Sequence, residues 1–221
     1  MNEIGTCKKF FIVIGLFILS QISITIFGLI QEISPHSLVG GNLLALILLI
    51  MVNIIILVWL TYKLKLIEFN FTWITKTNLF IIIGSTILLK VIAIMGTLLI
   101  QYFNGQEISN NDAALNSLFN GVNPVLLFLL IAISAPIMEE IVFRGGIIGL
   151  LCKNKPIIGI LLSSISFGLI HMATDIPNFL LYALMGLILS LSYYKPKRLE
   201  VSIMVHFLNN VIPAIAMIFL Q

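Results

Sequence analysis

The segment APIMEEIVFRGG, residues 135–146, places three ionisable side chains within a long apolar run. Glu139 and Glu140 are adjacent, and Arg144 follows Glu140 by four residues. Each charged side chain near the centre of a bilayer costs about 2.5 to 3.5 kcal/mol. A segment that retains three of them is therefore a candidate functional site.

Helical geometry predicts different roles for the two glutamates. Residues four apart on a helix share a face, whereas adjacent residues point about 100° apart. We therefore expect Glu140 to pair with Arg144 and to support the structure. Glu139 has only apolar neighbours on its own helix face. Desolvation disfavours the charged form of a carboxylate, a setting that suits a general base, so we interpret Glu139 as the reactive carboxylate.

Two later apolar runs add polar groups that suit hydrolysis. His171 lies in one, and the other contains His206 and Asn210, which share a helix face. Counting about 1.5 Å per residue from the basic ends of the runs places these residues and Glu139 near the middle of the membrane. Glu139 and His171 are predicted to activate a water. His206 and Asn210 are predicted to hydrogen-bond the developing oxyanion.

The same side chains leave a metal site open as an alternative. Glu139, His171 and His206 match a catalytic zinc set with one open position. Asn210 is a poor zinc ligand but a good oxyanion donor, which favours metal-free chemistry. The cofactor stays undetermined, with zinc as the candidate metal. For Lys90, another ionisable residue within a span, we expect a structural or pairing role.

The chain is predicted to be an all-α bundle with about seven transmembrane spans in a single domain, residues 1–221. It is 60% hydrophobic and 10% charged, far from the average of soluble proteins. No alternating barrel pattern occurs, and a lipid-facing helix satisfies its own backbone hydrogen bonds. Apolar runs of spanning length lie at residues 10–30, 42–62, 78–101, 123–151, 156–174, 177–194 and 199–220.

Basic residues alternate between the segments that connect these runs. They occur before the first run and after the second, fourth and sixth, whereas the other connections, which include the expected loop at residues 103–123, contain none. The positive-inside rule then places the N-terminus in the cytoplasm. The basic start imitates a signal peptide but lacks a clear cleavage site, so we expect a retained first helix. Because the basic residues form no patch, no nucleic-acid partner is expected.

Three motifs resemble those of the CPBP intramembrane proteases, which include type II CAAX prenyl endopeptidases and bacterial Abi proteins. EEIVFR at residues 139–144 resembles the EExxxR motif of that family. FGLIH at residues 167–171 resembles FxxxH, in which Phe167 packs and shapes the pocket. HFLNN at residues 206–210 resembles the third motif, a histidine followed four positions later by asparagine or aspartate. The resemblance covers residues 120–215 as a catalytic core.

The resemblance implies an intramembrane endopeptidase, of a family often labelled metalloprotease. The first glutamate and first histidine then activate water, and the second histidine and the asparagine form the oxyanion site. The implied partners are a membrane protein or peptide substrate and the lipid bilayer of a bacterial plasma membrane. Implied roles are bacteriocin self-immunity and peptide maturation, and prenylated substrates stay open because eight helices are not clearly present.

Two other classes of function remain alternatives. One is a non-enzymatic immunity or partner-binding membrane protein, and the other is a proton- or ion-coupled transporter. HExxH, GxGD and GxSxG motifs are missing from the sequence. Among protease chemistries, this favours water activation over a zincin, an aspartate or a serine mechanism.

Overall fold

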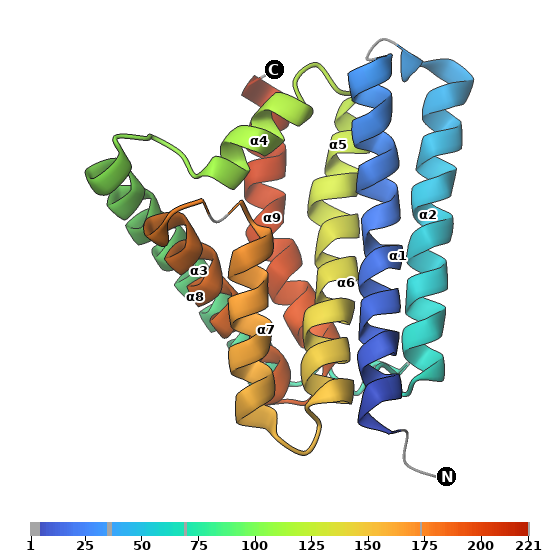
Figure 1. Cartoon of the computed structure of the whole chain (residues 1–221), viewed down its shortest axis with the longest axis vertical. Helices are drawn as coiled ribbons and strands as arrows, with labels where there is room; N and C mark the ends of the chain where they lie inside the picture. The colour runs from blue at the N-terminus through green and yellow to red at the C-terminus, as the bar shows by residue number, and fades with distance from the viewer. Residues whose placement is uncertain (1–4, 35–36, 69, 173, 221) are drawn as a thin grey trace.

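The described chain is entirely helical, in agreement with the all-α prediction. The computed structural model describes residues 5–34, 37–68, 70–172 and 174–220 and contains no strand among them (Figure 1). The elements in chain order are α1 (Thr6–Ile33), α2 (Gly40–Lys63), α3 (Lys76–Asn104), α4 (Asn110–Leu118), α5 (Pro124–Phe128), η2 (Leu129–Ser134), α6 (Ala135–Glu140), η3 (Ile141–Leu151), α7 (Pro156–Ile170), α8 (Ile176–Tyr194) and α9 (Leu199–Leu220). The segments α5, η2, α6 and η3 follow one another without a break and are called the central helix.

Six of these helices are long and apolar enough to cross a membrane, namely α1, α2, α3, the central helix, α8 and α9. All seven predicted runs form helices, but the run predicted at residues 156–174 forms only the 15-residue α7. At about 1.5 Å per residue it covers about 22 Å, less than the roughly 30 Å of a hydrocarbon core. The described residues thus contain six helices of spanning length rather than the predicted seven, and the cytoplasmic N-terminus stays a prediction.

The helix α4 lies in the segment that was expected to be a loop. Ser109 caps its first turn by accepting a hydrogen bond from the backbone N–H of Asp112 at 3.0 Å. Gly105 and Gly121 flank α4, and both have a φ of 68°, a left-handed conformation that glycine adopts without a Cβ clash. Because α4 is short and contains no apolar run, the apolar pattern of the sequence does not predict it.

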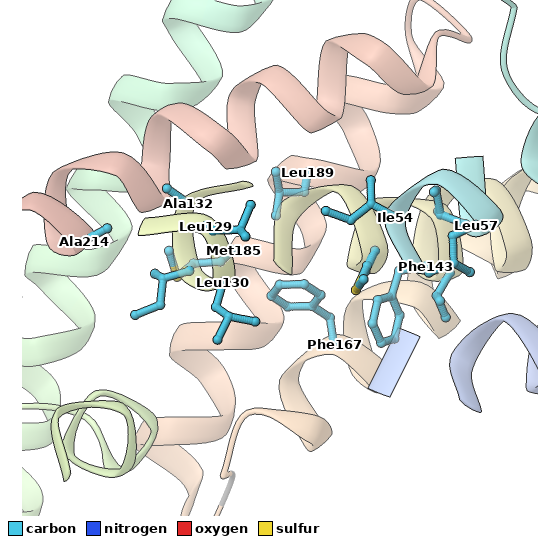
Figure 2. Packing of buried hydrophobic residues seen from close by; sticks show 14 of the residues in the cluster. Ile54, Leu57, Leu129, Leu130, Ala132, Phe143, Phe167, Met185, Leu189 and Ala214 are labelled. Carbon is cyan, nitrogen blue, oxygen red and sulfur yellow. The ribbon is translucent and has the colours of Figure 1, made fainter. Parts of the chain in front are cut away.

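The central helix is the most enclosed element of the fold. In Figure 1, α1 and α2 stand side by side on one flank of it, and α3 and α8 tilt away together on the other. Within the most apolar 18 residues of the central helix 67% are buried, compared with 17% in the equivalent stretch of α3. Figure 2 shows Phe143 of the central helix beside Phe167 of α7, with ring centroids 5.4 Å apart. Charges on this helix therefore face protein rather than lipid.

Two glycines let α7 and α8 approach closely. A Cβ atom built on Gly186 would lie 3.1 Å from the Cα of Ser164, and one built on Gly168 would lie 3.0 Å from the Cβ of Ala183. Both separations are tighter than ordinary packing. Small residues on the facing sides of α7 and α8 therefore permit a close helix contact. This contact fixes the end of α7, where His171 lies.

A side chain at Gly186 is expected to separate α7 from α8. Gly186→Leu should lower the free energy of unfolding by about 1–3 kcal/mol through overpacking. Gly84→Leu is the matched control, because Gly84 lies on α3 with no atom within 4 Å of a built Cβ. Thermal unfolding in lipid nanodiscs measures both variants. Equal unfolding midpoints for the two would contradict this packing.

Candidate active site

A cavity of about 770 Å³ lies between the central helix, α7, α8, α9 and the neighbouring faces of α1, α3 and α4. Glu139, His171, His206 and Asn210 all line it. They come from α6, from the end of α7 and from α9. The structure therefore brings the four residues that the sequence predicts for the chemistry into one space.

Glu139 faces two imidazoles across this cavity. Its Oε2 lies 3.7 Å from Nε2 of His171 and 3.9 Å from Nε2 of His206. Both separations exceed a hydrogen bond, and Oε2 has no hydrogen-bond partner among the described residues. The apolar setting expected from its own helix is therefore incomplete, because neighbouring helices contribute the two histidines.

The hydrogen-bond partners of the Nδ1 atoms determine the tautomers of His171 and His206. Nδ1 of His171 lies 2.6 Å from the backbone oxygen of Phe167. Nδ1 of His206 lies 2.9 Å from Oε1 of Glu140. A carbonyl and a carboxylate oxygen can only accept, so each Nδ1 must carry a proton and donate it. Each neutral imidazole then presents the lone pair of Nε2 toward Glu139.

Glu140 and Arg144 form the ion pair expected from their spacing, and the structure adds contacts to it. Arg144 Nη1 donates to Oε1 of Glu140 at 2.9 Å, and both side chains are fully buried. The same oxygen accepts the hydrogen bond from His206, which the sequence did not reveal. Arg144 Nη2 donates to the backbone oxygen of Gly186 on α8 at 2.8 Å. Its guanidinium carbon also lies 4.6 Å from the ring centroid of Phe167.

The ring of His171 is held between two aromatic rings. Phe167 stacks on one side with a centroid distance of 4.2 Å, and Tyr182 of α8 stacks on the other at 4.7 Å. The Tyr182 hydroxyl lies 2.7 Å from Ser109 Oγ and donates to Asp112 Oδ1 at 3.2 Å. Tyr182 escapes sequence analysis because it lies in an apolar run without a motif. It connects α4 to the catalytic candidate.

A proline explains the contact that Asn210 makes. In η2 the backbone N–H of Ala135 donates to the oxygen of Leu130, five residues earlier. The next bond in this series would join residue 136 to Ile131, but Pro136 has no N–H. Asn210 Nδ2 donates to this Ile131 oxygen instead, at 3.1 Å. The π-helical register therefore provides the anchor for the Asn210 amide.

The neighbour of Asn210 and the cation Lys90 complete this side of the cavity. Asn209 Nδ2 donates to Oδ1 of Asn210 at 3.2 Å, which leaves the Asn210 NH₂ group on the donor side. Lys90 Nζ donates to the backbone oxygen of Asn209 at 2.6 Å. No ion pair of Lys90 occurs in the described part of the chain. Its partner is a carbonyl rather than a carboxylate.

The side chains that would hold a metal are Glu139, His171 and His206, with the Glu139 oxygen 3.7 and 3.9 Å from the two imidazole nitrogens. Within residues 5–34, 37–68, 70–172 and 174–220, no three His, Cys, Asp or Glu side chains are arranged to hold a metal ion. Glu139, His171 and His206 come closest, and Asn210 is not a zinc ligand of the usual kind. No step of the chemistry below is therefore assigned to a metal.

The part of the chain that contains the site matches a known family, and several known proteins resemble the chain over about half of its length or more. Residues 121–212 match the family model for the type II CAAX prenyl endopeptidase Rce1-like proteins. The chain is 32% identical over 130 residues to the UPF0177 protein YvdC of Lactococcus lactis subsp. lactis, covering 59% of this chain and 49% of that protein. It is 34% identical over 124 residues to the membrane-embedded CAAX protease MroQ of Staphylococcus aureus, covering 53% and 49%.

A further relative is the UPF0177 protein in the abiGi 5' region of Lactococcus lactis subsp. cremoris. It is 31% identical over 146 residues, which cover 65% of this chain and 60% of that protein. The chain thus spans about half the length of the curated relatives it matches. No solved structure matches it. These matches confirm the resemblance found from the motifs: this is a multi-pass membrane protein, and its residues 121–212, which contain every candidate site residue, are similar to the Rce1-like type II CAAX prenyl endopeptidase family.

Proposed function

We propose that this chain is an endopeptidase that hydrolyses a peptide bond of a membrane protein or peptide at the level of the bilayer. The observation that carries the proposal is the meeting of Glu139 Oε2 with two imidazole Nε2 atoms, at 3.7 and 3.9 Å, in one cavity. The match of residues 121–212 to the Rce1-like type II CAAX prenyl endopeptidase family supports the proposal. Maturation of a peptide or bacteriocin self-immunity is the biological role we propose, on the resemblance alone.

The three facing atoms suit the activation of water. Glu139 Oε2 and the neutral Nε2 atoms of His171 and His206 are all acceptors, so a donor such as water can bridge them. In the proposed step, Glu139 takes a proton from this water, and the water oxygen attacks the scissile carbonyl carbon. The C–N bond then breaks, and the same proton passes from Glu139 to the leaving amine.

The two proposed oxyanion donors, Asn210 and His206, differ in whether they need an additional proton before they can donate. Asn210 keeps one N–H of its amide free, because the other is donated to Ile131. His206 already donates through Nδ1 to Glu140, so it can donate through Nε2 only as an imidazolium. The adjacent Glu140 carboxylate stabilises that cation. His206 takes up this second proton from solvent as the oxyanion forms and returns it when the C–N bond breaks, so the proton carried by Glu139 still passes to the amine.

Glu139→Gln should abolish cleavage while the protein remains in the membrane. Membrane proteomes and secreted peptides are compared between cells that carry the wild type and cells that carry the variant. A precursor should accumulate with Glu139→Gln, and its cleavage by purified protein should fall by a factor of about 100 or more, because a general base is lost. Glu32→Gln is the matched control, since Glu32 is exposed near the end of α1.

Wild-type cleavage by the purified Glu139→Gln variant would refute the assignment of Glu139. If the wild type, Glu139→Gln and a strain without the gene all gave the same peptides, the endopeptidase proposal itself would fall. A non-enzymatic membrane protein or a transporter would then be the better interpretation.

Glu140→Gln should act on stability, in contrast to its neighbour. The change leaves the fully buried Arg144 without a compensating charge. Removing one partner of a buried pair costs about 3–5 kcal/mol, so the unfolding midpoint should fall well below that of Glu139→Gln. Thermal unfolding of the two purified variants measures the difference. Equal midpoints would show that the Glu140 to Arg144 pair does not stabilise the fold.

The donor set also gives an expectation about metal. Elemental analysis is applied to purified wild type and to Glu139→Ala, His171→Ala and His206→Ala. We expect no stoichiometric zinc that depends on these three side chains, because Asn210 in the same cavity is a poor zinc ligand and a good oxyanion donor. One zinc per wild-type chain that disappears in all three variants would overturn the metal-free mechanism.

A further inference from the structure

The helix α9 contains a proline whose effect falls on the candidate site. Pro213 lies inside α9. In a regular helix the N–H of residue 213 would bond to the carbonyl of residue 209, but proline has no N–H and its ring crowds that carbonyl. The Asn209 oxygen therefore lacks its helical partner. In an apolar environment, a carbonyl without a donor is destabilising.

Lys90 of α3 supplies the missing donor. Its Nζ donates to the Asn209 oxygen at 2.6 Å, a contact between residues 119 positions apart in the sequence. A cation retained in an apolar span needs a reason. Within the described ranges no carboxylate forms an ion pair with Lys90. The carbonyl released by Pro213 is the partner that the structure shows.

The contact extends from Lys90 to the proposed oxyanion donor in two steps. Lys90 holds the backbone of Asn209, a residue that is 8% exposed. The Asn209 amide donates to Oδ1 of Asn210, and Asn210 Nδ2 donates to Ile131. A shift of the Asn209 backbone would therefore turn the Asn210 amide. The same arrangement occurs on both sides of the cavity, since Pro136 frees the Ile131 oxygen that anchors Asn210.

We propose that Lys90 is a positioning residue that replaces the N–H missing at Pro213 and thereby holds Asn210 in place for catalysis. Lys90 acts through Asn209 and does not touch the reacting atoms. The inference rests on the proposed endopeptidase function, because it assigns a purpose to the orientation of Asn210. It also makes a separate claim about Lys90 and Pro213 that needs no catalysis.

The test is a double-mutant cycle of Lys90→Met and Pro213→Ala. Pro213→Ala restores the backbone N–H, so the Asn209 carbonyl no longer depends on Lys90. We expect Lys90→Met to lower kcat by about tenfold or more in the wild-type background, with KM little changed. In the Pro213→Ala background the same change should lower kcat by less than about threefold. Lys90→Arg keeps a donor and should retain most of the activity.

Each other outcome identifies what has failed. An equal loss of kcat in both backgrounds, or a rise in KM alone, means that Lys90 contacts the substrate directly and overturns the positioning role. Unchanged activity of Lys90→Met overturns it as well. Thermal unfolding of the four purified proteins tests the same coupling without a substrate, and additive shifts in midpoint would refute it. If the wild type, Glu139→Gln and a strain without the gene gave the same peptides, the proposed function would fall instead, and the unfolding cycle would remain valid.

Discussion

One carboxylate oxygen, Oε1 of Glu140, joins the helices on which the site depends. It accepts from Arg144 Nη1 and from His206 Nδ1, each at 2.9 Å. Arg144 continues to the Gly186 backbone of α8. Because a buried charge that loses its partner is strongly destabilising, the central helix, α8 and α9 are constrained to one arrangement. In that arrangement the Nε2 atom of His206 faces Glu139.

The two adjacent glutamates differ in what their oxygens face. Glu140 holds two donors on Oε1, and its Oε2 has no hydrogen-bond partner in the described chain, but Glu140 does not line the cavity that Glu139 lines. Glu139 Oε2 has no hydrogen-bond partner in the described chain and lies near two acceptor nitrogens. A base must have a free lone pair that points at its substrate. Because adjacent residues on a helix point about 100° apart, Glu140 can support the structure while Glu139 faces the cavity.

The sequence predicted the contacts that form within one helix and missed those that form between two helices. The Glu140 to Arg144 pair follows from i,i+4 spacing, and the common depth of the site residues follows from a fixed rise per residue. Contacts of Tyr182 with His171, and of Lys90 with the Asn209 carbonyl, depend on how each helix is rotated and tilted. No periodicity encodes that rotation. The length of α7 was overestimated for a local reason, since the backbone leaves the helix at His171 and Met172 follows with a left-handed φ of 53°.

The central claim is that Glu140 orients His206 so that its Nε2 faces Glu139. Nitrogen-15 NMR of histidine-labelled protein in lipid measures it directly, because the chain has three histidines and each ring nitrogen reports its own proton. His171→Gln and His206→Gln variants assign the signals. The structure predicts that His206 carries its proton on Nδ1 with a hydrogen bond to a carboxylate, and that His171 is also protonated on Nδ1. A neutral His206 that is protonated on Nε2 and bare at Nδ1 cannot donate to Glu140, and this result would contradict the account.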